Sequence, residues 1–172
     1  LYEIFEEKLL GILDQFAEVK PYVLETVEEL RKRGIKIGST TGYTDKMMGI
    51  VVPKAKENGY EPDAWFSPDA VEGFGRPYPY MVFKNMQALG IQSVDQVMKV
   101  GDTVSDIREG KNAGVYTVGV IEGSSEMGLS EAEYEALSEE EKEDQIARVK
   151  EKFLNAGADA VIRNMKELTD LL

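Results

Sequence analysis

Three short clusters of polar residues each follow an apolar segment of the sequence and could bind an anion or a metal ion. The first cluster spans residues 39–44, where hydroxyl groups and glycine-flanked N–H groups precede a predicted helix. Such donors at a helix N-terminus suit the oxygens of a phosphate or a phosphonate. A helix cap is the competing interpretation of the same residues. The candidates in this cluster are Thr40, Thr41, Gly42 and Tyr43.

The second and third clusters carry the charged groups. Arg76 precedes Pro77, which favours an extended arginine at the mouth of a helix, where its guanidinium could neutralise an anion. An exposed surface arginine is the alternative. In the third cluster, Asp102 follows Gly101 at a strand end, and Asp106 comes four residues later. Two such carboxylates suit Mg²⁺, although Asp102 could instead cap a helix and Asp106 favour its dipole.

The composition narrows the chemistry that these clusters can perform. The 172 residues include no cysteine and no histidine, so thiolate and imidazole groups are excluded as nucleophiles, bases and metal ligands. Any bound metal must therefore be held by oxygen. The net charge of −12 argues against a nucleic-acid partner, which needs clustered Lys and Arg. We expect a small-molecule partner, no membrane span and a cytoplasmic location.

The segments between the clusters predict an α/β fold with a parallel sheet. Apolar strands alternate with amphipathic helices, and strands joined by helices of this length require crossover connections. Ligands then bind at the carboxyl ends of the strands, where all three clusters fall. The glutamate-rich segment 130–152 is interpreted as a solvated helix face. The predicted strands are 35–39, 64–67, 97–100, 115–120 and 158–162, and the helices are 21–33, 44 onward through Pro53, 79–89, 106–113 and 165 onward.

Together and in this order, the clusters resemble the second, third and fourth motifs of the haloacid dehalogenase superfamily. The strings IKIGSTTGYT at 35–44 and KVGDTVSD at 99–106 are similar to its branch that cleaves C–P bonds, and the similarity extends over the whole chain. The resemblance implies that Thr41 holds phosphonate oxygens and that Arg76 stabilises charge on the transferring group. It also implies that Asp102 ligates Mg²⁺. Asp106 would then lie beside Asp102 or contact the ligands of the metal without binding the metal itself.

The activity implied by the resemblance is hydrolysis of the C–P bond of a phosphonate aldehyde. In that chemistry a lysine of a cap domain forms a Schiff base with the aldehyde, and an aspartate accepts the phosphoryl group. Two alternatives remain open at this point. One is a phosphatase or phosphomutase of the same superfamily that acts on a C–O–P ester. The other is a non-catalytic, Mg²⁺-binding α/β module.

The sequence departs from the superfamily pattern before the first motif. No Asp-x-Ala-Gly-Thr strand end that could carry the nucleophile precedes Ser39, and the cap with its lysine is missing too. The resemblance implies that residues 1–18 are the last cap helix and a linker, and that 19–172 are the C-terminal part of a Rossmann-like core. The missing strand would lie between the strands ending at Ser39 and Gly101, leaving two open edges. We expect this chain to derive from a longer protein and to be inactive or poorly folded alone. The resemblance implies that the longer protein forms a homodimer through its cap.

Overall fold

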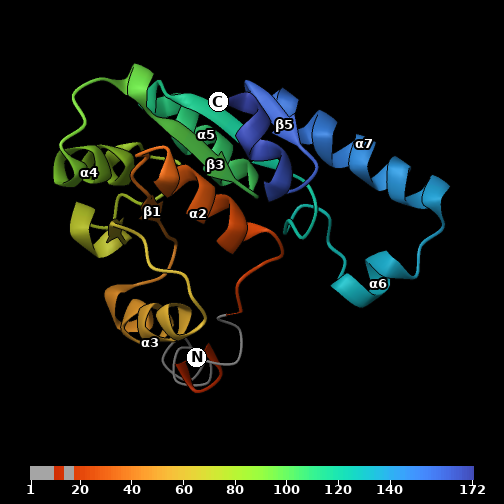
Figure 1. The fold of residues 1–172 in the computed structure, drawn as a ribbon, viewed down its shortest axis with the longest axis horizontal. Coiled ribbons are helices and arrows are strands. Elements are labelled where there is room, and N and C mark those ends of the chain that lie inside the picture. Colours follow the sequence, from red (N-terminus) through yellow and green to blue (C-terminus); the bar gives the residue numbers. More distant parts are fainter. Residues whose placement is uncertain (1–9, 14–17) are drawn as a thin grey trace.

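Five short parallel strands lie at the centre of the computed structural model, which describes residues 10–13 and 18–172 (Figure 1). They form two sheets. The first sheet pairs β1 with β2, and the second has the order β3-β4-β5, with every pair parallel. The α/β class with parallel strands that the sequence predicts is confirmed. The strands are β1 (Gly38–Thr40), β2 (Ala64–Phe66), β3 (Met98–Gly101), β4 (Tyr116–Val120) and β5 (Ala160–Ile162).

The two sheets are not joined to each other within the described part of the chain. Ser39 of β1 is in register with Trp65 of β2, and Val100 of β3 is in register with Val118 of β4. No strand pairing links β1 to β3 among the described residues. The break therefore falls between the two strands that the superfamily resemblance separates by a further strand.

Helices cover both faces of the three-stranded sheet. On one face, Leu30 and Leu168 pack with buried valine and isoleucine side chains of β4 and β5. On the other face, Ile107 packs with Val149 and Phe153. Helices therefore lie on both sides of this sheet (Figure 1). Every residue of β4 except Tyr116 is buried. The helices are α2 (Val23–Lys32), α3 (Asp45–Glu57), α4 (Tyr80–Leu89), α5 (Val104–Ala113), α6 (Glu131–Glu135) and α7 (Glu139–Ala156), with 3₁₀ turns η2 (Pro68–Val71), η3 (Val94–Gln96) and η4 (Met165–Leu171).

A glycine in β4 lets α7 approach the sheet. A Cβ atom on Gly119 would lie 2.6 Å from the ring of Phe153, which is closer than carbon atoms can pack. Phe153 itself is completely buried. The glycine thus sets the distance between α7 and the sheet that carries the third polar cluster.

Strand β1 begins three residues later than predicted. The apolar run suggests a strand from Ile35, but the side chain of Asp63 accepts the N–H of Ile37 at 2.7 Å. The carbonyl of Ile37 in turn accepts the N–H of Asp63, also at 2.7 Å. A side chain therefore replaces a neighbouring strand at this point, and regular pairing starts only at Gly38.

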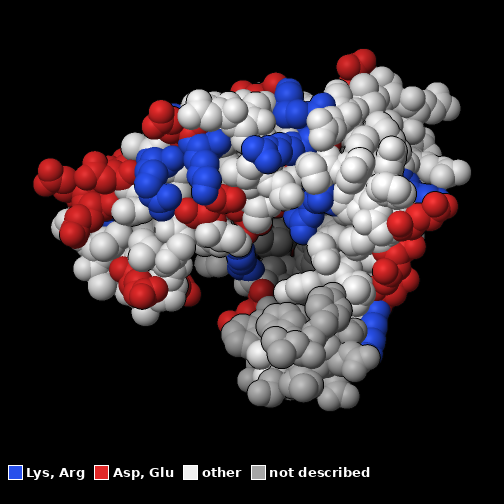
Figure 2. All heavy atoms as spheres, turned by 180° about the vertical axis from the view of Figure 1, so that it is seen from behind, with Lys and Arg blue, Asp and Glu red and all other residues white. Residues whose placement is uncertain are grey.

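The acidic segment 130–152 forms two helices rather than one continuous face. Ser130 and Ser138 each cap a helix in a capping box with a glutamate three residues later, Glu133 and Glu141. On the face shown in Figure 2, acidic side chains gather at the end of the molecule that carries α6 and α7.

Most of residues 1–18, the predicted last cap helix and linker, lies outside the described residues. Within the described residues, no helix is both long enough and apolar enough to cross a membrane.

Candidate active site

The loop after β1 holds the first polar cluster and leads into α3. The N–H of Thr41 donates to the carbonyl of Phe66 at 3.3 Å, and the Thr41 hydroxyl accepts the N–H of Tyr43 at 3.0 Å. The cap of α3 is Thr44, whose hydroxyl accepts the N–H of Met47. Helix capping is therefore assigned to Thr44, and it does not explain the hydroxyl groups of the two preceding threonines.

The third cluster follows β3 directly. Helix α5 begins at Val104, two residues earlier than predicted, because the hydroxyl of Thr103 caps it by accepting the N–H of Asp106 at 3.1 Å. Asp102 is therefore not the cap. The close approach of the strand end to the helix needs Gly101, since a Cβ atom there would lie 2.2 Å from the Cβ atom of Asp106.

The side chain of Arg76, in the second cluster, contacts Asp106 in the third cluster. Its Nη1 atom donates to Oδ1 of Asp106 at 2.5 Å. Its Nη2 atom lies 3.0 Å from the place where a side chain on Gly42 would begin, so the guanidinium passes close to the loop after β1. Arg76 thus links the strand ends of the two sheets.

Asp106 is the anion that organises this group. The carboxyl group accepts bonds from Arg76 and from the hydroxyl of Thr103 at 2.6 Å, and Lys99 lies 3.0 Å away. Burial raises the pKa of Asp106, but the charges of Lys99 and Arg76, with the hydrogen bonds from Thr103 and Arg76, lower it to about 2 overall. Asp106 is therefore ionised at neutral pH, and both of its oxygens are in use.

A hollow of about 480 Å³ opens at these strand ends, and we refer to it as the strand-end hollow. Of the residues predicted for the site, Gly42 and Arg76 line it directly. Thr41 and Asp102 each adjoin a lining residue, because Gly42 follows Thr41 and Thr103 follows Asp102. The remaining lining residues are Pro68, Gly73, Gly75, Tyr78 and Ser105.

Asp102 lies beside a cation that belongs to the chain. Lys20 donates to Oδ2 of Asp102 at 2.8 Å and to the carbonyl of Gly123 at 2.5 Å. The side chain of Asp102 keeps 35% of its surface exposed. This pair of oxygens, a carboxylate and a carbonyl, holds positive charge at the end of β3.

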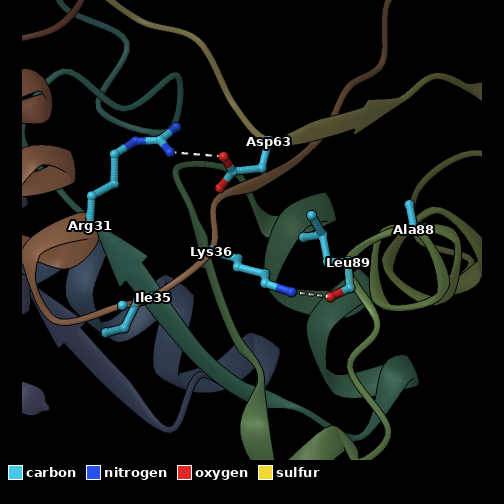
Figure 3. Close-up of a pocket in the computed structure, with 7 residues that line it drawn as sticks. Arg31, Ile35, Lys36, Asp63, Ala88 and Leu89 are labelled. Carbon is cyan, nitrogen blue, oxygen red and sulfur yellow. Dashed lines mark hydrogen bonds and ion pairs between the residues drawn. The ribbon is translucent and has the colours of Figure 1, made fainter.

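A second hollow, of about 340 Å³, lies at the opposite ends of β1 and β2 (Figure 3). Two basic side chains line this hollow, Arg31 and Lys36, and each of them binds an oxygen of the chain. Arg31 donates to Asp63 at 2.8 Å, and Lys36 donates to the carbonyl of Leu89 at the end of α4 at 2.6 Å. These contacts fasten α2 and α4 to the sheet, and none of the predicted site residues lies there.

Sequence reasoning missed Lys20, Lys99 and Glu109. Lys99 stands between Met98 and Val100 in a half-buried apolar strand, and a lone charge in such a strand is a signal that could have identified it. Glu109 is completely buried on α5, but the sequence around it looks like an ordinary exposed helix. Lys20 lies 82 residues from Asp102, and no local pattern reveals this pair.

The model of the haloacid dehalogenase-like hydrolase family matches residues 2–114, which is more than half of the chain. The chain belongs to this family. The superfamily assignment made from the three motifs is therefore confirmed.

Relatives of this family match the chain over its full length. A phosphonoacetaldehyde hydrolase of Lysinibacillus sphaericus is 52% identical over 172 residues, which span 64% of that protein. A bifunctional phosphonoacetaldehyde hydrolase/aminoethylphosphonate transaminase of Clostridioides difficile is 49% identical, and the match spans 27% of it. The crystal structure of a phosphonoacetaldehyde hydrolase-like protein from Oleispira antarctica has a TM-score of 0.91 at 34% identity, over 99% of this chain and 61% of that one. The chain thus spans less than two thirds of each of these relatives.

Proposed function

We propose that this chain forms most of the catalytic core of a phosphonoacetaldehyde hydrolase, which converts phosphonoacetaldehyde and water to acetaldehyde and phosphate. One observation carries the proposal. The strand-end hollow is lined by Gly42, Arg76 and Thr103, one from each predicted cluster, in a chain that is 52% identical to a phosphonoacetaldehyde hydrolase.

The phosphonate group is bound in the strand-end hollow. Thr41 and the N–H groups around Gly42 contact its oxygens, with Thr40 and Tyr43 flanking them, because this loop presents short polar groups at the start of α3. Arg76 faces the same space. One of its nitrogens is held by Asp106, which leaves its other donors to stabilise negative charge on the group being transferred.

Of the two predicted Mg²⁺ ligands, Asp102 and Asp106, only Asp102 is placed to bind the metal. Asp102 is a partly exposed carboxylate that already holds a cation together with the carbonyl of Gly123, and hard oxygen donors of this kind suit Mg²⁺. Asp106 is committed to Arg76, Lys99 and Thr103, so its place is beside the metal and not on it. Among the described residues, no group of three or more acidic side chains is positioned to hold a metal. When bound at Asp102, Mg²⁺ would offset negative charge on the phosphonate.

The Schiff-base lysine and the nucleophilic aspartate are supplied from outside these 172 residues. The lysine amine condenses with the aldehyde and releases water, and the resulting iminium accepts the electron pair of the breaking C–P bond. The phosphoryl group passes to the aspartate, and water then releases it as phosphate. The enamine left on the lysine takes up a proton, and a second water hydrolyses the resulting imine to acetaldehyde and the free amine. The break between β1 and β3 supports a further strand at this point, as does the greater length of the relatives.

A homodimer formed through the cap and a cytoplasmic location stay predictions from the resemblance and the composition. Neither is needed for the chemistry of the strand-end hollow.

The experiment compares two substrates with the full-length protein. Phosphonoacetaldehyde is expected to give phosphate and acetaldehyde in equal amounts, with Mg²⁺ required. A phosphate monoester is expected to react far more slowly. Faster release of phosphate from the ester would contradict the proposal and favour a phosphatase of the same family.

A further inference from the structure

A buried cluster of charges lies directly beneath the strand-end hollow. Lys99 of β3 is only 11% exposed and contacts three acceptors. It lies 2.7 Å from the hydroxyl of Thr40, 3.0 Å from Oδ1 of Asp106 and 2.7 Å from Oε2 of Glu109. One ammonium group thus donates a hydrogen bond to a strand hydroxyl and forms ion pairs with two helix carboxylates.

The cluster is neutral when Arg76 is included. Two cations, Arg76 and Lys99, balance two carboxylates, Asp106 and Glu109. Buried charges are tolerated only when they are paired and hydrogen-bonded, so removing one member leaves an uncompensated charge. One buried oxygen of the cluster, Oε1 of Glu109, has no hydrogen-bond partner within the described part of the chain.

The cluster joins elements that are otherwise separate at the site. Thr40 belongs to β1 and Lys99 to β3, and these strands lie in different sheets of the described structure. The hydroxyl of Thr40 also donates to Glu109 at 2.8 Å, which ties the same strand end to α5. Thr40 immediately precedes the anion-binding loop, and Asp106 holds the guanidinium that faces the hollow.

We propose that Lys99 and Glu109 are positioning residues for the anion site of the proposed hydrolase. They fix Thr40 and Asp106, and through these they fix the loop after β1 and the guanidinium of Arg76. Without Lys99, two carboxylates share a single cation, which draws Arg76 inward and away from the bound anion. When both residues are replaced, Thr40 at the end of β1 loses these attachments to α5.

The test separates a positioning role from a merely structural one. In the full-length protein, Lys99→Met lowers the melting temperature, because it leaves Glu109 buried without its partner. The double variant Lys99→Met/Glu109→Leu removes both charges and regains most of that loss, since apolar replacement of a buried pair is often neutral. Its affinity for inorganic phosphate, measured by calorimetry, stays about tenfold or more below that of the parent, and its kcat for phosphonoacetaldehyde falls by a similar factor.

A matched control uses a partly exposed ion pair between the same helix, α5, and the residue before β5. Lys111 contacts both carboxylate oxygens of Asp159, at 2.8 and 2.9 Å, away from the strand-end hollow. The double variant Lys111→Met/Asp159→Leu is expected to bind phosphate within about twofold of the parent, because exposed pairs contribute little.

Thr40→Val provides a second variant of nearly unchanged shape. It removes only the hydroxyl that joins Lys99 and Glu109 to β1, and it is expected to weaken phosphate binding about threefold or more while the protein stays folded. Phosphate affinity that returns with the melting temperature in the Lys99→Met/Glu109→Leu protein would overturn the inference. If that protein does not fold, unchanged affinity in Thr40→Val would overturn it. A parent that binds phosphate but leaves phosphonoacetaldehyde intact would refute the proposed function alone.

Discussion

Replacing Asp106 by asparagine tests the charge balance under the site. The substitution keeps the size of the side chain but removes the negative charge that faces Arg76 and Lys99. The side chain is only 5% exposed, so water cannot replace the lost interactions. We therefore expect the substitution to destabilise the protein as well as to displace Arg76.

The size of the effect follows from the pKa of Asp106, which falls from 3.8 to about 2 in the folded protein. At about 1.4 kcal/mol for each pKa unit, this fall corresponds to about 2 kcal/mol of folding free energy. Because the folded-state pKa is the lower one, this stabilisation is complete above about pH 4. It is lost as the pH falls through about 2.

The assay is urea denaturation of the full-length parent and of Asp106→Asn at several pH values. At pH 7 the free energy of unfolding of the variant should be lower by about 2 kcal/mol or more. This difference should shrink between about pH 4 and pH 2, where only the parent gains a proton on the aspartate. Asp95→Asn, at an exposed residue that contacts Ser93, is the control and should show little change. A difference between parent and Asp106→Asn that does not vary with pH would refute the reasoning.

Three further predictions concern the same strand ends. Asp102→Asn should weaken Mg²⁺ binding, measured by calorimetry, more than Asp106→Asn does, because only Asp102 is placed as a ligand; equal losses would contradict this assignment. Arg76→Lys should lower kcat by about tenfold or more, because one ammonium group cannot both pair with Asp106 and donate two parallel hydrogen bonds to the phosphonate. An unchanged kcat would show that a single positive charge suffices. Gly101→Ala should lower the melting temperature, with a cost of about 1–3 kcal/mol, because its Cβ would lie 2.2 Å from that of Asp106; an unaltered melting curve would contradict the packing described here.

The position of the site could be predicted from the sequence because it depends on chain order and strand direction. Thr41, Arg76 and Asp102 each follow an apolar segment, and parallel strands bring their carboxyl ends to one edge. The strand-end hollow lies at that edge and is lined by Gly42, Arg76 and Thr103. Periodicity and crossover rules therefore sufficed for the fold class and for the sheet edge near which these residues lie, while the roles of the residues stay predictions.

The contacts within the site could not be predicted, because they depend on side chains from distant elements. Whether Asp102 or Thr103 caps α5 is decided by the exact start of the helix, which periodicity gives only to within a few residues. The partners of Lys99 come from β1 and α5, and Lys20 reaches Asp102 from before α2. Such pairings become visible only when the strands are placed next to one another.

The start of β1 shows a competing local interaction. The apolar run from Ile35 predicts a strand, but the carboxylate of Asp63 takes the N–H of Ile37 before any neighbouring strand can do so. A side-chain acceptor from 26 residues away thus shortens the strand, and no pattern around Ile37 reports it.

The most direct test of the account is borohydride trapping with phosphonoacetaldehyde, carried out side by side on the full-length protein and on the isolated 172-residue chain. The full-length protein should release phosphate and acetaldehyde, and borohydride should inactivate it by reducing an imine on a lysine outside these 172 residues, which peptide mass mapping would identify. The isolated chain should give neither phosphate nor a reduced adduct. Turnover by the isolated chain, or an adduct on Lys20 beside Asp102, would contradict the proposed division of the active site.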